Sequence, residues 1–106
     1  MPRSYSLTGE EIRNLSGKRL HGRFFSLLVA PLPGKHAKCA CVVSKKVARE
    51  APKRNLIKRR SRAVCSTKVK SIQKPIALVL YAKKGVDAAS FVDIRADITD
   101  LFEKVS

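Results

Sequence analysis

The stretch Pro75–Tyr81 (PIALVLY) decides the fold class of this chain of 106 residues. It is almost entirely apolar, which predicts a strand that is buried on both faces of a sheet. Lys83-Lys84-Gly85 ends the strand. A strand of this kind lies within a small sheet that has helices packed on it, and the flanking segments supply those elements.

The segment that follows this strand, from Ala88 onward, is predicted to be helical. Its apolar side chains recur at helical spacing and form one continuous stripe: Phe91, Ile94, Ile98, Leu101, Phe102 and Val105. The other faces carry half of the chain's eight acidic residues: Asp93, Asp97, Asp100 and Glu103. This acidic helix is the surface least suited to bind a polyanion.

Two apolar runs upstream are predicted to be strands, Leu20–Ala30 and Cys39–Val43. A loop that contains Pro31–Gly34 joins them. Consecutive strands are usually neighbours, so these two are expected to pair antiparallel.

The remaining elements are helices. Thr8 and Glu11 form a capping box, which predicts a short helix that ends near Ser16-Gly17, and residues 1–7 are expected to be loose. A second helix is predicted over Pro52–Val69. The order is therefore α-β-β-α-β-α, an α+β sandwich in which a small mixed sheet is packed with helices, and we expect one domain over residues 1–106.

The chain is strongly basic, with 23 Lys and Arg against 8 Asp and Glu and a formal net charge of +15. A compact chain with this charge repels itself, which indicates a polyanionic partner. The hydrophobic content of 44% is enough for a globular core, so the chain is not a disordered polycation. No apolar run approaches the roughly 18–20 residues of a membrane span. The N-terminus MPRSYSLTGEE lacks the apolar region of a secretory signal, so a cytoplasmic protein is expected.

The cysteines and histidines give no strong sign of a site. Cys39, Cys41 and Cys65 are too few, and odd in number, for a disulfide framework, and they read as small hydrophobic residues of a reduced protein. A metal site that combines them with His36 is the alternative, but the metal-binding spacings are absent. His21 and His36 have no acidic neighbour, so no catalytic or metal-binding residue is predicted.

The segment Ser44–Lys70 (SKKVAREAPKRNLIKRRSRAVCSTKVK) carries most of the charge. It holds eleven basic residues against Glu50 alone, and so accounts for +10 of the formal +15. Pro52 suits the first turn of a helix, while the residue before it is disfavoured in helical geometry. We therefore expect a turn or short helix over Ser44–Arg49 and the main helix after it.

Helical geometry sorts the side chains of this helix into an inward face and a cationic edge. The inward face is thin and consists of Ile57, Ser61, Val64 and Cys65. The cationic edge carries Arg54, Lys58 and Arg62, with Arg59 beside them. Cations at this spacing repel one another, which indicates an edge kept for the phosphates of an outside partner. Arg60 falls at the border of the inward face and is expected to extend its head into water.

The sequence around this helix resembles a known family, the bacterial ribonuclease P protein component. The family signature reads V-S-K-K-V, a short spacer, then R-N-R-x-K-R-x-x-R-E. Val43–Val47 (VSKKV) and Arg54–Arg62 (RNLIKRRSR) are similar to it, and the resemblance extends over residues 7 to 105. Gly17–Phe25 is similar to the family's first strand, and Ala77–Gly85 is similar to its third.

The resemblance implies a fold like the second domain of ribosomal protein S5, with a left-handed β-α-β crossover around the basic helix. It also implies a protein that binds a large catalytic RNA and the 5′ leader of precursor transfer RNA. In the family, the RNA performs the cleavage that produces the mature 5′ end, with Mg²⁺ bound mainly by the RNA. The protein alone would be inactive, and no protein partner or membrane is implied.

The charged segment and the resemblance together predict the contact residues. The RNA-binding set is Lys45, Lys46, Arg49, Lys53, Arg54, Asn55, Lys58, Arg59 and Arg62. The cleft that holds the leader is expected to include Phe25 and Arg23, since single-stranded RNA is held by stacking surfaces combined with charge. The chain departs from the family pattern at Leu56, Ala63 and Pro52, at Asn14-Leu15 in place of a phenylalanine, and at Leu28 in place of a tyrosine.

Two other functions remain open from the residues alone. A structural RNA-binding module, such as a ribosomal protein or an RNA chaperone with no role in cleavage, fits the composition equally well. A DNA-binding domain with the basic helix in a major groove is the weaker alternative, because few side chains besides Asn55 could read base edges.

Overall fold

The computed structural model describes residues 7–105. Its elements, in chain order, are α1 (Gly9–Arg13), β1 (Lys18–His21), β2 (Phe25–Pro31), β3 (Lys38–Val42), α2 (Ala51–Val69), β4 (Ile76–Ala82), the 3₁₀ helix η2 (Val86–Ala88) and α3 (Phe91–Glu103). The expected loose segment lies outside the described residues except for Leu7. The backbone N–H of Leu7 donates to the Cys39 carbonyl at 3.2 Å, so this residue is tied to the sheet.

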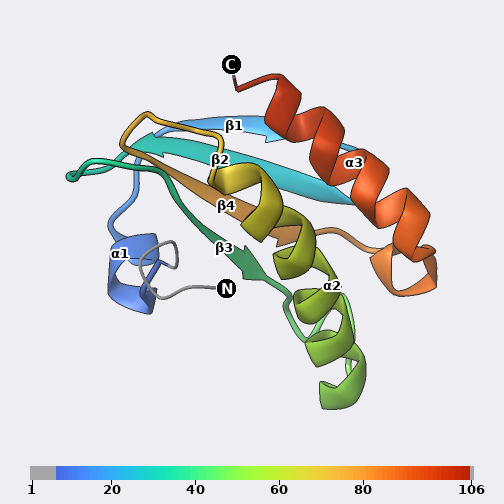
Figure 1. The fold of residues 1–106 in the computed structure, drawn as a ribbon. Helices are drawn as coiled ribbons and strands as arrows, with labels where there is room; N and C mark the ends of the chain where they lie inside the picture. The colour runs from blue at the N-terminus through green and yellow to red at the C-terminus, as the bar shows by residue number, and fades with distance from the viewer. Residues whose placement is uncertain (1–6, 106) are drawn as a thin grey trace.

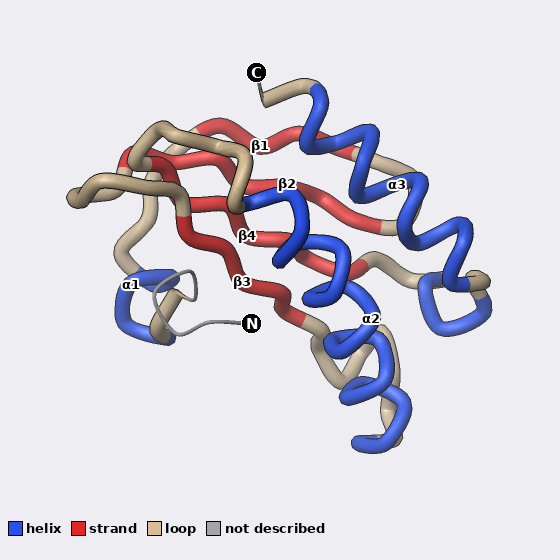
Figure 2. The backbone as a smooth tube through the Cα atoms, viewed as in Figure 1, coloured by secondary structure: helices blue, strands red, loops and turns tan. Residues whose placement is uncertain are grey.

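The four strands form one mixed sheet in the order β1-β2-β4-β3 (Figure 2). β4 lies between β2 and β3, antiparallel to the first and parallel to the second. The predicted antiparallel pairing of the two apolar runs 20–30 and 39–43 is therefore wrong. The neighbour of both runs is β4, whose central residues Ala77–Leu80 are fully buried, as its apolar sequence predicted.

The connection β3-α2-β4 is a left-handed crossover. In Figure 1 both strands run from left to right, α2 lies in front of the sheet, and β4 lies above β3. Right-handed twist of strands favours the opposite hand in nearly all such units. The crossover and the mixed sheet packed with helices confirm the expected fold class, with one strand more than the predicted order.

The additional strand arises because the run 20–30 folds as a hairpin. β1 and β2 pair antiparallel, with Leu20 opposite Leu27, and a tight turn over residues 22–24 joins them. The carboxylate of Asp97, on α3, accepts the backbone N–H groups of Arg23, Phe24 and Phe25 at 2.8, 2.9 and 3.0 Å. The residue that holds this turn lies more than 70 positions away in the sequence, so the local pattern could not show it.

Helices α2 and α3 lie side by side on one face of the sheet (Figure 1). The main core lies between them and the sheet and includes Leu27, Leu78, Leu80, Ile94 and Ile98. The opposite face of the sheet carries the alternate residues of each strand. At one end of that face, Leu7 and Leu15 pack on a small cluster of Ala30, Leu32 and Ala77.

The helix boundaries follow local signals. The capping box of Thr8 and Glu11 is present and starts α1, although this helix ends at Arg13 rather than near residue 16. The side chain of Ser90 caps α3 by accepting from the Asp93 N–H. Residues 44–49 form a turn rather than a helix, in which Val47 and Ala48 donate to the Ser44 carbonyl.

Candidate nucleic-acid interface

Helix α2 buries a narrow face, and its charged side chains occupy the exposed remainder of its surface. The buried residues are Ile57, Ser61, Val64, Cys65 and Val69, which confirms the predicted inward face. Two of these five side chains, Ser61 and Cys65, are small and two more are valines, so the helix lies close to β3 and α3. Pro52 lies in the first turn, as expected. The wide outer surface is strongly basic.

Lys58, Arg59 and Arg62 of the predicted cationic edge line a shallow hollow of about 520 Å³ on this outer surface, and Arg54 does not. Its lining residues are Asn55, Lys58, Arg59, Arg62, Ala63 and Ser66. Four of the predicted RNA-binding residues therefore lie together. Three cations beside one amide and one hydroxyl can bind phosphate oxygens and can also hydrogen-bond a sugar or a base edge.

The cations of residues 44–70 form no ion pair with a carboxylate of the described residues. Over residues 7–105 the ion pairs are Lys38 with Glu11 at 3.6 Å and Lys104 with Asp100 at 3.8 Å, and neither involves this segment. Glu50 is exposed at the start of α2 and makes no side-chain cap hydrogen bond. The positive charge is thus available to a partner from outside, as the sequence predicted.

Arg54 has a second role that sequence reasoning missed. Its Nη1 donates to the carbonyl of Ala48 at 3.1 Å and to that of Arg49 at 2.7 Å. These bonds tie the first turns of α2 to the preceding loop, on which Lys45 and Lys46 are exposed. Arg54 therefore shapes the loop that presents these lysines. An arginine with a structural role is usually recognised by a carboxylate near it in the sequence. Here Glu50 is the only such residue and the partners are backbone carbonyls, so the sequence did not show this role.

The two residues predicted for the leader cleft, Phe25 and Arg23, lie in different environments. Phe25 is 0% exposed and lies in the main core, on the face of the sheet that the helices cover. A side chain with no exposed surface cannot stack on a base, so this assignment of Phe25 is wrong. Arg23 is exposed in the β1–β2 turn, with its guanidinium 5.0 Å from the centroid of the Phe24 ring. It remains available to a ligand.

The opposite face of the sheet carries polar and aromatic residues that were not predicted. The guanidinium of Arg19 lies 4.6 Å from the centroid of the Tyr81 ring, across β2. His21 is hydrogen-bonded through Nδ1 to Ser26 at 3.3 Å, and Lys38 projects from β3 towards α1. This open face combines charge with an aromatic ring, as single-stranded RNA requires. The alternation of side chains along each strand indicates which residues share a face. The pairing of the strands had to be known before these residues could be assigned to one surface.

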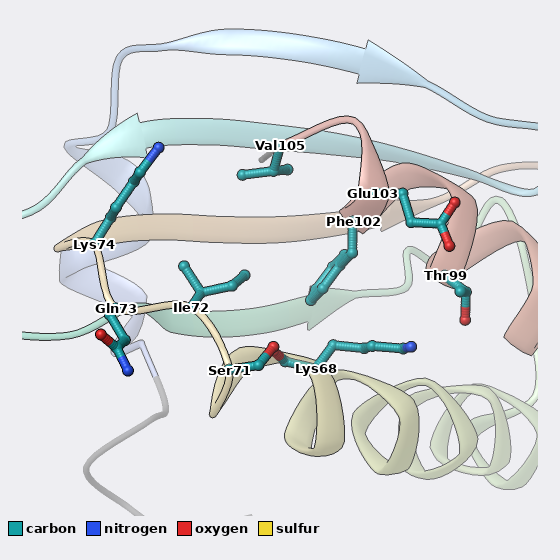
Figure 3. A pocket seen from close by; sticks show the side chains of 9 residues that line it. All are labelled: Lys68, Ser71, Ile72, Gln73, Lys74, Thr99, Phe102, Glu103 and Val105. Atoms are coloured by element: carbon teal, nitrogen blue, oxygen red, sulfur yellow. The ribbon is translucent and has the colours of Figure 1, made fainter.

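A separate hollow of about 410 Å³ lies where α2 ends beside α3 (Figure 3). Ile72, Phe102 and Val105 supply its apolar walls, while Lys68 and Glu103 lie at its border. None of the predicted RNA-binding residues lines it.

The three cysteines lie within the core and are free thiols. Burial raises the pKa of the Cys41 thiol to about 11, so this sulfur stays protonated at neutral pH. Among residues 7–105, no cluster of three or more His, Cys, Asp or Glu side chains is arranged to hold a metal ion. No helix in the same range is long and apolar enough to cross a membrane.

Comparison with known proteins agrees with this fold. The family model described as ribonuclease P matches residues 1–106. The chain belongs to the ribonuclease P protein family. A curated relative, the ribonuclease P protein component of Picosynechococcus sp., is 40% identical over 67 residues. That match covers 63% of this chain and 58% of the relative, so the chain spans little more than half of the relative's length.

Solved structures of ribonuclease P proteins share the fold. The Staphylococcus aureus protein superposes with a TM-score of 0.85 at 18% identity, over 96% of this chain and 95% of that one. The Thermotoga maritima protein gives a TM-score of 0.75 at 22% identity, over 86% of each chain. At these identities the likeness shows the fold alone. Within the ribonuclease P signature this chain has Leu56 at the third motif position, and Leu56 is half-buried on α2.

Proposed function

We propose that this chain is the protein subunit of ribonuclease P, acting in the cytoplasm. In this role it binds the catalytic RNA and the 5′ leader of precursor transfer RNA, and it assists the RNA-catalysed cleavage that produces the mature 5′ end. The observation that carries the proposal is the hollow on α2, where Lys58, Arg59 and Arg62 meet beside Asn55 without a carboxylate partner among the described residues.

The proposed mechanism is electrostatic. Two RNA molecules repel each other, and cations placed between them lower that cost. The α2 hollow and the exposed Lys45 and Lys46 would contact phosphates of the catalytic RNA, with the loop held in shape by Arg54. Mg²⁺ would be held mainly by the RNA, which performs the hydrolysis. No residue of the chain is a catalytic residue in this scheme.

The leader would lie on the open face of the sheet. Arg19 and Tyr81 stack there at 4.6 Å, and Lys38 lies on a neighbouring strand. An unpaired RNA strand gains affinity from stacking and from contacts between its phosphates and cations. This face takes the place of the buried Phe25 in the leader contact.

Reconstitution with a bacterial ribonuclease P RNA at low Mg²⁺ tests the proposal. The protein is expected to stimulate cleavage of a precursor transfer RNA. Replacing Lys58 and Arg62 by alanine should weaken RNA binding by roughly tenfold or more, since it removes contacts to phosphates. The matched control removes two exposed cations elsewhere, Lys35→Ala with Lys104→Ala, and is expected to bind nearly as the wild type does.

Two outcomes would contradict the proposal. RNA binding without any gain in cleavage would instead indicate a structural RNA-binding module. Equal losses in the α2 variant and in its control would show that only net charge matters. The leader contact is tested with Arg19→Ala and Tyr81→Ala, which should slow cleavage of substrates with a leader of several nucleotides and leave a substrate with a minimal leader unaffected.

A further inference from the structure

A second cationic group lies on the other flank of α2, facing α3. Arg60 of α2 and Arg95 of α3 both approach the ring of Phe91, with guanidinium carbons 5.9 and 5.3 Å from its centroid. A shallow groove of about 350 Å³ continues from this ring between the two helices. Its lining residues are Ala63, Val64, Thr67, Lys68, Phe91, Arg95 and Thr99. Neither arginine belongs to the predicted RNA-binding set.

The two arginines are held in place without being neutralised. Phe91 is half-buried against the main core, so the ring offers a fixed surface to both guanidinium groups. Neither arginine is in the ion pairs of residues 7–105. A cation held by an aromatic ring keeps its hydrogen-bond donors free. The pair is therefore ready to bind an anion.

The acidic residues of α3 mostly face away from this groove. Helical geometry places Asp93, Asp97 and Asp100 on the flank opposite Arg95. Asp97 is bound to the β1–β2 turn, and Asp100 is paired with Lys104. Glu103 borders the neighbouring hollow beside Lys68, three turns from the start of α3. The field at the Phe91 end is thus positive, and Lys68 contributes less because a carboxylate is near it.

The position of the groove favours RNA as its occupant. Arg59 and Arg60 are adjacent on α2, and their side chains diverge by about 100° around the helix axis. Arg59 points to the hollow on one flank, and Arg60 points to Phe91 on the other. The helix between the two flanks is only about 10–12 Å wide. A sugar–phosphate chain bound in the hollow can therefore cross the helix and reach Arg60.

We propose that Arg60 and Arg95, positioned by Phe91, form a second binding site for RNA phosphates in the groove between α2 and α3. The site extends the contact of the α2 hollow, and it rests on the proposed function. Guanidinium groups bind phosphate oxygens in pairs of parallel hydrogen bonds. Because both groups lie against one ring, a phosphate chain that runs over α2 can reach them together.

The test compares variants in binding to ribonuclease P RNA over a range of salt concentrations. Arg60→Gln with Arg95→Gln removes two phosphate contacts, and should weaken binding about tenfold and lower the magnitude of the log–log salt slope by about 1.5. Arg60→Lys with Arg95→Lys keeps the charge, and should retain the slope while losing part of the affinity. The control pair Lys35→Gln with Lys104→Gln should leave the slope near that of the wild type. Thermal unfolding of each variant is measured alongside.

Each result supports or overturns the site. An unchanged slope in the glutamine pair, with the wild type still binding RNA and stimulating cleavage, refutes the second site and leaves the proposed function standing. An unchanged slope would also be the result if the groove served an acidic protein. A reduced slope in the glutamine pair, with no stimulation of cleavage by the wild type, supports the site and refutes the proposed function. If the glutamine pair proves unstable, the lysine pair and the single variant Arg95→Gln replace it in the test. A salt slope that the lysine pair retains and Arg95→Gln reduces still supports the site. A slope that Arg95→Gln leaves unchanged refutes it.

Discussion

Replacing Asp97 by alanine should destabilise the fold more than any other single loss of an acidic side chain among the described residues. Its carboxylate accepts three backbone N–H groups of the β1–β2 turn at 2.8–3.0 Å. A hydrogen bond to a charged group contributes about 1.5–3 kcal/mol. The N–H of Arg23 is exposed and can bind water instead, so the bonds of Phe24 and Phe25, which are partly buried, decide the cost.

Two such bonds give a loss of about 3–4 kcal/mol in the free energy of unfolding, allowing for the fact that such terms are not additive. A domain of this size has a total stability of about 5–15 kcal/mol. The melting temperature should therefore fall by roughly 10–20 °C. Asp97→Asn keeps one acceptor oxygen without the charge and should lose about half as much.

Urea denaturation followed by circular dichroism measures this effect. The matched control is Asp100→Ala, one turn further along α3, whose exposed ion pair with Lys104 at 3.8 Å should contribute less than about 0.5 kcal/mol. If the free energy of unfolding of Asp97→Ala lies within about 0.5 kcal/mol of the wild type, which is the usual range for an exposed substitution, the carboxylate does not hold the turn and the account of the hairpin fails.

Three further predictions concern binding, packing and chemistry. RNA binding that neutralises about six phosphates should show a log–log salt slope near −4 to −5, and a slope near zero would exclude the charge argument. Gly17→Ala should destabilise the protein in the same denaturation assay by about 2 kcal/mol or more, because a Cβ there would collide with the Val29 carbonyl oxygen and with Ala30; a neutral effect would show that β2 can shift to make room. Since burial raises the pKa of Cys41 from 9.0 to about 11, the stability that the protonated thiol contributes should be complete below pH 9 and be lost as the pH rises towards 11. Native protein at pH 8 should therefore resist iodoacetamide at Cys41 and react in urea, as read by mass spectrometry, whereas rapid native labelling would place this thiol at the surface.

The sequence predicted the candidate site better than the contacts around it. The spacing of Ile57, Val64 and Cys65 gave the buried face of α2, and with it the exposed edge of Lys58 and Arg62, because helical geometry is local. The second role of Arg54 could not be inferred, since its partners are carbonyl groups whose direction depends on the fold of the preceding loop.

The sheet face was a harder problem. Phe25 was expected in a cleft and lies in the core. A shift of one residue in the register of a strand moves every side chain to the opposite face, so the face of Phe25 could not be assigned from the sequence. The hairpin that sets this register depends on the turn over residues 22–24 and on Asp97, which is distant in sequence. The pairing of Arg19 with Tyr81 depends on the same register.

The sequence by itself determined the elements that rest on short-range order: the helices, the buried strand β4, and a basic helix whose cations have only Glu50 nearby in the chain. Only the tertiary structure decided the split of β1 from β2, the insertion of β4 between β2 and β3, and the approach of Arg60 and Arg95 to one ring. The physical reason is one of range. Helix periodicity and capping act over a few residues, whereas strand order and contacts between helices are set by which distant surfaces can be buried together.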